Sequence, residues 1–291
     1  MTTERRVPTT RIGRLATLGR LAGGVAGGMA SEGARLLGKG QRPSLNDLLL
    51  TPANARRLAE RLSEMRGAAM KVGQLLSMDG GNLVPPQLSE ILAKLRDNAH
   101  QMPLGDVAAI LKASWGDHWH ENFKRFDFKP VAAASIGQVH DATLADGRRV
   151  AVKIQYPGVR SSIDSDIDNV ATLLRIPGLM PRDMDLAPIL KEAKLQLHQE
   201  ADYQSEARNL TAFHDLLAGS EVFRLPELHA DLSTPQVLAM SYVESEPIEA
   251  LCDTPQALRD HVATQLIDLV LSELFSFRQM QTDPNLANYR F

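Results

Sequence analysis

The sequence predicts an α+β protein in which helices surround a small antiparallel sheet. Three observations lead to this fold class. Apolar residues recur at alternating four- and three-residue spacing between Leu58 and Leu76, as on one face of a helix. Alternating and β-branched residues fill 123–155, with a hairpin turn at Ala145-Asp146-Gly147. A long stretch with helical spacing returns near the end, opened by Thr254-Pro255.

The expected elements follow one another in a simple order. Residues 45–115 are expected to be mainly helical, in three stretches separated by Pro85-Pro86 and Met102-Pro103. The hairpin turn joins two expected strands, and residues 162–217 are then expected to form helices interrupted near Pro177 and Pro181. A second pair of strands precedes the last helix, which is expected to end near Phe277. The four expected strands cover residues 139–143, 149–155, 222–226 and 236–243.

Composition excludes several classes of protein. The 291 residues are 44% hydrophobic and 23% charged, which is ordinary for a globular chain. A formal net charge of -3 gives no reason to expect a nucleic-acid partner. Cys252 is the single cysteine, so neither an internal disulfide nor a multi-cysteine zinc site can form. Because no apolar run approaches the ~18–20 residues of a membrane-spanning helix, we expect a soluble or membrane-peripheral protein.

Residues 1–43 form a basic segment that also contains glycines. Its basic residues far outnumber its acidic residues, Glu4 and Glu32. Such a segment can lie on an anionic membrane, although its glycines weaken any helix there. A mobile, solvated tail is the alternative. The basic residues are Arg5, Arg6, Arg11, Arg14, Arg20, Arg35, Lys39 and Arg42.

A lysine follows the hairpin turn in Val150-Ala151-Val152-Lys153. Protein kinases carry at this point the lysine that holds the α- and β-phosphates of ATP. A lysine that ends an apolar strand is common, so its surroundings decide the interpretation. Upstream lies a small-residue loop, where backbone N–H groups can approach a phosphate closely, unless the segment is only an ordinary tight turn. The residues of this loop are Ala132, Ala133, Ala134 and Ser135.

Three acidic residues lie downstream in the predicted helical region. If this segment is one helix, Asp202 and Glu206 share a face, while Glu200 points elsewhere and meets a different partner. Kinases use a helix carboxylate to orient the strand lysine toward phosphate. A solvated acidic helix face is the alternative.

Asp283 and Asn288 lie five residues apart after the long apolar helix. Kinase catalytic loops have this interval between the catalytic aspartate and the asparagine that binds Mg²⁺. The aspartate can accept a hydroxyl proton or position a water molecule. A polar turn is the alternative, because the interval alone is a weak signal.

Five motifs therefore occur in order: Lys71-Val72-Gly73-Gln74, Ala132-Ala133-Ala134-Ser135, Lys153-Ile154-Gln155-Tyr156-Pro157-Gly158, Glu200-Ala201-Asp202-Tyr203 and Gln281-Thr282-Asp283-Pro284-Asn285. Together they resemble the UbiB atypical kinases, which are linked to ubiquinone biosynthesis. The resemblance covers about residues 66–291 and implies a protein-kinase-like two-lobed fold with an N-terminal helical extension.

The resemblance implies roles for individual residues, with ATP or ADP and Mg²⁺ as cofactors. Lys153 would contact the phosphates with Glu206 as its partner, and Lys71 would lie near Glu200 on a helix folded over the pocket. The implied catalytic residues are Lys153, Glu206 and Asp283, and the implied metal ligand is Asn288. The implied nucleotide-binding residues are Ala132, Ala133, Ala134, Ser135, Lys153, Met240 and Val243. The residues implied to cover or regulate the pocket are Lys71, Gln74, Glu200 and Asp202.

The expected domains are a basic segment (1–43), a helical extension (44–115), a kinase-like N-lobe with inserted helices (116–243) and the start of a C-lobe (244–291). Many UbiB proteins have His-Pro-Gly at the position of Asn285-Leu286-Ala287, and an Asp-Phe-Gly motif follows their catalytic loop. Since the sequence ends at Phe291, the C-lobe is expected to be incomplete and activity impaired.

The function expected from these observations is ATP-dependent phosphotransfer or ATP hydrolysis that supports ubiquinone biosynthesis. Expected partners are a nucleotide, a membrane surface or prenyl-lipid intermediates, and ubiquinone-biosynthesis proteins, but no nucleic acid. A cytoplasmic location is expected, with peripheral attachment to the inner membrane as a further expectation. A non-catalytic nucleotide- or lipid-binding scaffold is the alternative. An aminoglycoside-type small-molecule kinase is a third candidate, against which the Lys71–Gln74 motif argues.

Overall fold

The computed structural model describes residues 101–176, 180, 184–282 and 286–291. Before these it describes residues 65–78 and the separate positions 27, 35, 38, 51, 54, 58–60 and 62–63. Nearly all of the basic segment 1–43, and the helical stretch expected near residues 88–95, lie outside this part of the chain.

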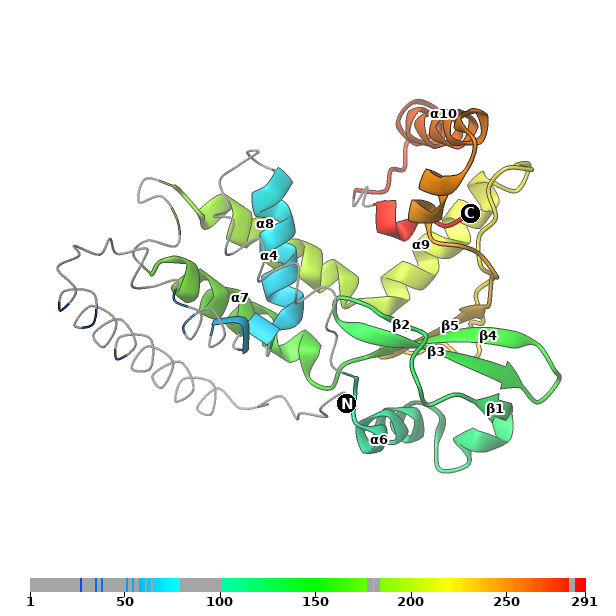
Figure 1. Cartoon of the computed structure of the whole chain (residues 1–291). Coiled ribbons are helices and arrows are strands. Elements are labelled where there is room, and N and C mark those ends of the chain that lie inside the picture. The colour runs from blue at the N-terminus through cyan, green and yellow to red at the C-terminus, as the bar shows by residue number, and fades with distance from the viewer. Residues whose placement is uncertain are drawn as a thin grey trace.

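A five-stranded antiparallel sheet forms the centre of the fold (Figure 1). Its order is β1–β3–β4–β5, and β2 pairs with β3 beyond the end of β1. The predicted hairpin is confirmed, because β3 pairs with β4 and Gly147 at their turn adopts a φ of 94°. The strands are β1 (Phe123–Phe126), β2 (Ala132–Ala133), β3 (Gly137–Leu144), β4 (Arg149–Gln155) and β5 (Val237–Ser241).

The two faces of the sheet differ in burial. Side chains alternate between the faces along a strand, so the register assigns each residue to one face. On one face Val152 and Ile154 are fully buried and belong to a core shared with α6 (Leu104–Trp115). On the other face Ala151 and Lys153 are only half-buried. Around Ala151 and Lys153, the second face is therefore less completely covered than the first.

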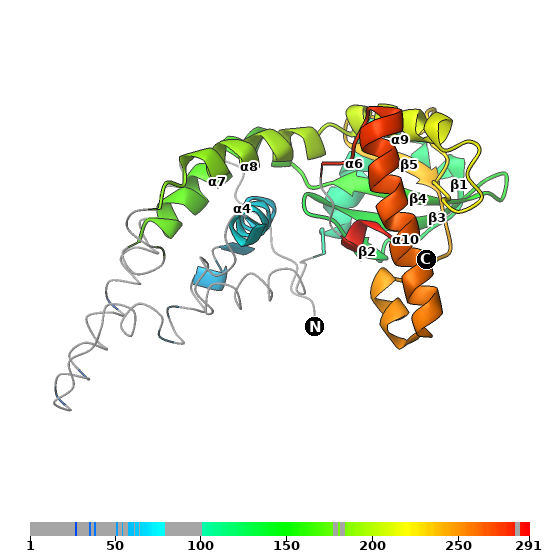
Figure 2. The same ribbon diagram turned by 90° about the horizontal axis from the view of Figure 1, so that it is seen from above.

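A second core lies beside the sheet, where three helices pack against one another (Figures 1 and 2). These are α4 (Arg66–Met78), α7 (Val159–Leu174) and α8 (Ala187–Glu200). The helical spacing near the N-terminus is confirmed, since its apolar residues are buried in this core. They are Leu58, Leu62, Met65, Ala69, Val72 and Leu76.

Helix α9 (Tyr203–Leu216) connects the two cores. It follows α8 after only two residues and contacts β5. The buried side chain of Gln155, at the end of β4, donates from Nε2 to the carbonyl of Ala201 at 3.1 Å. This bond ties the junction of α8 and α9 to the sheet.

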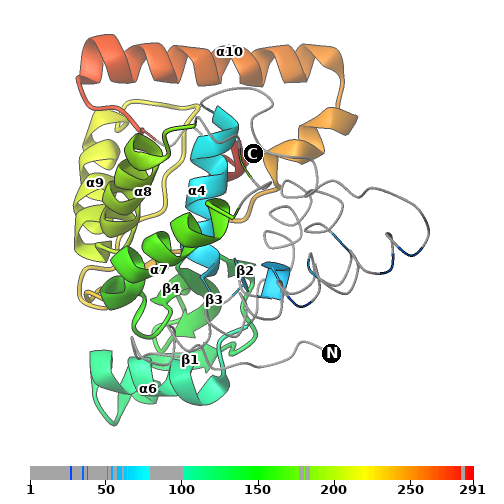
Figure 3. The ribbon, with the colours of Figure 1, turned by 90° about the vertical axis from the view of Figure 1, so that its left-hand side faces the viewer.

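The chain after β5 runs through a 3-10 helix (Ile248–Asp253) into α10 (Gln256–Ser272), which ends in a turn of π-helix (Glu273–Phe277). Figure 3 shows α10 crossing the end of the molecule beyond α9. The predicted extent of this helix is confirmed, although Thr254 does not cap it, because its hydroxyl donates to the carbonyl of Leu251 instead.

One predicted strand is absent. Residues 222–226 form no strand, because the hydroxyl of Ser220 accepts the backbone N–H groups of residues 222 and 223 at 3.2 and 3.1 Å. Residues 227–229 meet the outer edge of β5 instead, where the N–H of Ser241 bonds to the carbonyl of Glu227 at 2.8 Å. A local turn thus replaces the expected ladder.

Candidate functional site

Lys153 lies within β4 on the half-buried face of the sheet. It is paired with Val139 of β3 on one side and Leu238 of β5 on the other, so both neighbouring strands fix its position. Its ammonium donates to both carboxylate oxygens of Glu206, at 2.7 and 2.8 Å. The lysine side chain is 20% exposed, so the pair stays in contact with solvent.

The start of α9 sets the direction of Glu206. Asp202 caps this helix, and its carboxylate accepts the backbone N–H of Ser205 at 3.2 Å. The three acidic residues do not share one continuous helix, because α8 ends at Glu200 and α9 begins at Tyr203 with Asp202 as its cap. Glu200 and Glu206 consequently lie on different helices and meet different lysines.

Glu200 joins three parts of the chain. One carboxylate oxygen pairs with the ammonium of Lys71 on α4, and the other accepts a hydrogen bond from the hydroxyl of Ser135 at 2.6 Å. Lys71 is 4% exposed, so this ion pair is largely shielded from water. Helix α4 also approaches closely at Gly67, where a Cβ atom would lie 3.1 Å from the carbonyl oxygen of Ser135. The N-terminal helix is therefore held against the alanine-rich segment.

The alanine-rich segment is a short strand and a tight turn, which corrects the expectation of a loop throughout. Ala132 and Ala133 form β2 and pair with β3, so their backbone groups take part in the sheet. The turn is closed by a hydrogen bond from the N–H of Ala134 to the carbonyl of Gly137 at 2.9 Å. The side chains of this strand are exposed methyl groups, which leave space above them.

The remaining predicted pocket residues lie on two other elements. Met240 pairs with Ala151 in the sheet, Val243 follows β5, and both residues are half-buried. Gln74 lies three residues after Lys71 on α4 and is also half-buried.

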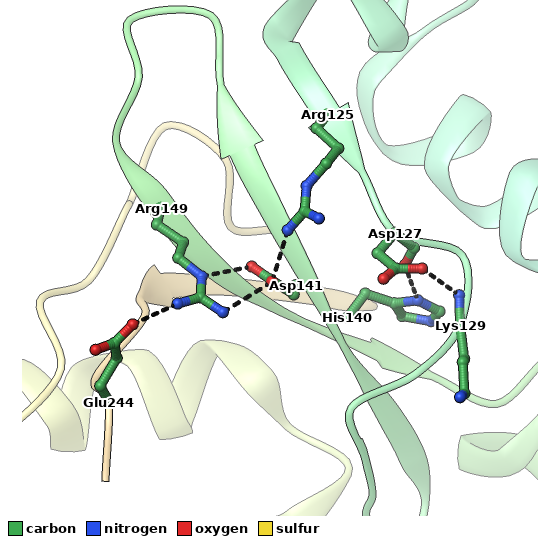
Figure 4. Close-up of polar contacts among 7 residues, drawn as sticks. All are labelled: Arg125, Asp127, Lys129, His140, Asp141, Arg149 and Glu244. Carbon is green, nitrogen blue, oxygen red and sulfur yellow. Dashed lines mark hydrogen bonds and ion pairs between the residues drawn. The ribbon is translucent and has the colours of Figure 1, made fainter.

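A charged cluster holds the segment after β5 against its neighbours (Figure 4). Asp141 accepts hydrogen bonds from Arg125 and Arg149, and its side chain is only 8% exposed. The hydrogen bonds from Arg149 lower the pKa of Asp141, while burial acts in the opposite direction. Arg149 also bonds to Glu244 at 2.8 Å and lies 3.8 Å above the ring of Tyr242. One arginine of β4 thus fixes the segment that leads away from the sheet.

A buried polar chain lies on the opposite face of the sheet. His140 Nδ1 is 2.8 Å from the carbonyl oxygen of Asp127, and Nε2 is 2.9 Å from the amide nitrogen of Gln138. Because that amide nitrogen can only donate, the histidine carries its proton on Nδ1. Burial lowers the pKa of His140. Gln138 in turn accepts the N–H of Met102, which ties the start of α6 to β3.

Asp283, the predicted catalytic aspartate, lies outside the described residues. Asn288 ends the short 3-10 helix Leu286–Asn288 and is exposed. Glu273, which was not predicted as a site residue, is 2% exposed and accepts the N–H of Gln281 at 3.1 Å. Burial raises the pKa of Glu273. The sequence gives no sign of this role, because Glu273 is one acidic residue in a long predicted helix. The structure places Glu273 in the π-helical turn, where its carboxylate binds the segment that follows.

Metal binding has no further support from the described part of the chain. Within these residues, no group of three or more His, Cys, Asp and Glu side chains comes close enough together to hold an ion.

A small antiparallel sheet, a strand lysine paired with a helix carboxylate, and a helical region after the last strand define a kinase-like protein. A solved structure with this likeness is that of Rv3197 with erythromycin from Mycobacterium tuberculosis. The TM-score is 0.54 at 32% sequence identity, and the match covers 80% of this chain and 60% of that one.

Sequence comparison identifies the family. Residues 94–291 match the ABC1 atypical kinase-like domain. The mitochondrial atypical kinase coq-8 of Caenorhabditis elegans is 45% identical over 98% of this chain, and COQ8 of Saccharomyces cerevisiae is 39% identical over 98%. The chain spans 38% and 57% of the lengths of these two relatives. The chain belongs to the ABC1, or UbiB, family of atypical kinases, and the resemblance drawn from its motifs is confirmed.

Proposed function

We propose that the chain binds ATP or ADP on the half-buried face of its sheet, as part of a UbiB-type atypical kinase or ATPase. The ion pair between Lys153 and Glu206 carries this proposal, because it is short, bidentate and still partly exposed. In kinases the equivalent glutamate orients the lysine so that its ammonium meets the α- and β-phosphates. The ammonium of Lys153, oriented in this way, would still be able to donate a hydrogen bond to the phosphates of a nucleotide.

The surroundings of this pair suit a nucleotide. Ala151 and Met240 lie on the same face as Lys153 and offer an apolar surface for the adenine, with Val243 beyond them. The methyl side chains of Ala132 and Ala133 leave room for phosphates to approach the edge of the sheet. We assign Ala134 and Ser135 to the same phosphate-facing turn.

The catalytic chemistry is proposed for the segment after α10. Asp283 would accept the proton of an attacking hydroxyl or position a water molecule, and the side-chain oxygen of Asn288 would bind Mg²⁺. Mg²⁺, when bound, would neutralise charge on the phosphates. The buried Glu273 supports this role, because it holds the N–H of Gln281 at the start of the segment.

The N-terminal extension is proposed to regulate access to the pocket. Lys71 and Ser135 both bind Glu200, so α4 is fastened to the turn that faces the phosphates. In the sequence, Gln74 follows Lys71 by three residues on α4, and Asp202, which caps α9, follows Glu200 by two. A helix fixed here would leave little room for a protein substrate, which favours ATP hydrolysis or phosphorylation of a small molecule.

The biological setting is proposed from the family. UbiB proteins are linked to ubiquinone biosynthesis, so prenyl-lipid intermediates and enzymes of that pathway are the proposed partners. In the described part of the chain, no helix is long and apolar enough to cross a bilayer. We propose peripheral contact with a membrane through the basic segment 1–43.

Nucleotide binding can be tested by thermal unfolding of the full chain with Mg-ADP. At a concentration about 100-fold above Kd, the ligand should stabilise the wild type by about 2.7 kcal/mol. Lys153→Ala should lose this shift. Lys194→Ala is the matched control, because Lys194 also forms a 2.7 Å ion pair, with Asp168, but on the surface of α7 and α8. An undiminished shift in Lys153→Ala would remove this lysine from the site.

Phosphate release by the wild-type chain separates the two classes of function. Mg-ATP-dependent release that is lost in Lys153→Ala supports the atypical kinase or ATPase. Nucleotide binding without release supports the non-catalytic scaffold instead.

A further inference from the structure

Tyr203, the first residue of α9, stands out among the buried side chains of the site. It is 1% exposed and belongs to the core between the helices and the sheet. Its hydroxyl has no hydrogen-bond partner among the described residues. Buried tyrosine hydroxyls usually find a partner, so the position of this ring requires an explanation.

The ring of Tyr203 faces the ammonium of Lys153. The distance from Nζ to the ring centroid is 4.9 Å, within the range of a cation–π contact. Glu206, which binds the same ammonium, lies three residues further along α9, on the same side of the helix. The ring and the carboxylate therefore approach Lys153 together from one turn of helix.

The hydroxyl end of Tyr203 contacts the start of β3. A Cβ atom on Gly137 would lie 2.8 Å from the hydroxyl oxygen and 2.4 Å from the carbonyl oxygen of Ile154. The phenol is thus confined between β3 and β4, which prevents the ring from moving away from Lys153. Burial, followed by the neighbouring Glu206, raises the pKa of Tyr203 well above its ordinary value, so the ring remains a neutral phenol.

We propose that Tyr203 is a positioning residue for the phosphate-binding lysine: its ring holds the ammonium of Lys153 beside Glu206, while its hydroxyl end rests against Gly137. This inference depends on the proposed function, because it assumes that Lys153 meets nucleotide phosphates. Tyr203 acts through Lys153 and does not touch the nucleotide.

A purely structural role for Tyr203 predicts a different outcome. A core residue that only stabilises the fold should affect adenosine and ADP binding alike when it is changed. A residue that orients Lys153 should affect ADP, which carries phosphates, and leave adenosine unchanged. The ratio of the two affinities therefore separates positioning from packing.

The experiment measures binding of Mg-ADP and of adenosine to the full chain by titration calorimetry. Tyr203→Leu, which lacks the ring, should bind ADP about tenfold more weakly, while the Kd for adenosine should change less than about twofold. Tyr203→Phe keeps the ring and should remain within about threefold of wild type for ADP. An equal loss for both ligands in Tyr203→Leu would overturn the proposal.

A second series keeps the fold intact if the leucine variant is unstable. Phenylalanine, 4-fluorophenylalanine and 3,4,5-trifluorophenylalanine at position 203 have nearly the same shape, but fluorine withdraws charge from the ring face. The ratio of ADP to adenosine affinity should fall with each fluorine. A constant ratio would refute the role of Tyr203. If the wild type binds no ADP, or Lys153→Ala binds it equally well, the proposed function fails first and the Tyr203 proposal fails with it.

Discussion

Gly137 begins β3 at a point where a side chain has no space. A Cβ atom would lie 2.4 Å from the carbonyl oxygen of Ile154, which is 1.0 Å inside the 3.4 Å at which ordinary contact begins. It would also lie 2.8 Å from the hydroxyl of Tyr203, or 0.6 Å inside that limit. Gly137→Ala is therefore expected to destabilise the sheet beside Lys153.

The magnitude follows from which atoms can move. Tyr203 is confined in the core, and the carbonyl of Ile154 belongs to β4, so relief requires a shift of the paired strands. Overpacking of this kind costs about 1–3 kcal/mol, and a backbone contact belongs at the upper end. Replacing glycine in a strand returns about 0.5–1 kcal/mol of conformational entropy. The net loss is about 2 kcal/mol, or roughly 4–8 °C in Tm at the ~2–4 °C per kcal/mol of domains of about 150–250 residues.

Thermal unfolding followed by circular dichroism measures this loss. Gly105→Ala is the matched control, because Gly105 lies in α6 with no atom within 4 Å of its added Cβ, and alanine favours a helix. Its Tm should stay equal or rise. Gly137→Ala combined with Tyr203→Phe should recover only part of the loss, because the shorter contact, with Ile154, remains. A Gly137→Ala chain as stable as the wild type would refute the close approach of these strands.

Three further predictions concern buried charged or titratable groups. Burial lowers the pKa of His140, so below pH 6.5 the imidazole is protonated in the unfolded chain before it is protonated in the folded chain. The Tm should therefore fall as pH drops below 6.5, and His140→Gln should weaken this dependence. Burial raises the pKa of Glu273 above 4.5, so ionising this residue is less favourable in the folded chain than in the unfolded chain. The Tm should therefore fall as pH rises from 4.5 through the pKa of Glu273 in the folded chain, and Glu273→Gln should flatten that slope. Lys71→Ala should cost about 2–3 kcal/mol in denaturant unfolding, less than a fully buried pair because Glu200 is 28% exposed. Lys194→Ala at a more exposed pair should cost under about 1 kcal/mol, and equal losses would contradict the shielding of Lys71.

Local sequence patterns predicted much of the fold for simple physical reasons. The turn at Ala145-Asp146-Gly147 joins the predicted hairpin because glycine tolerates a positive φ. Helical spacing identified the buried face that includes Leu62 and Val72. The same reasoning failed at residues 222–226, where a serine hydroxyl captured the backbone N–H groups that a strand would have used.

The motifs along the chain determined the family and named both lysine–glutamate pairs, because the residue types that bind phosphate are few and their order is specific. Only the tertiary structure showed how the chain brings each of these carboxylates to its own lysine. Asp202 ends one helix and caps the next, so Glu200 turns to Lys71 while Glu206 turns to Lys153. The buried contacts of Tyr203 with Lys153 and Gly137 also join segments far apart in sequence, and no local pattern records where such segments meet.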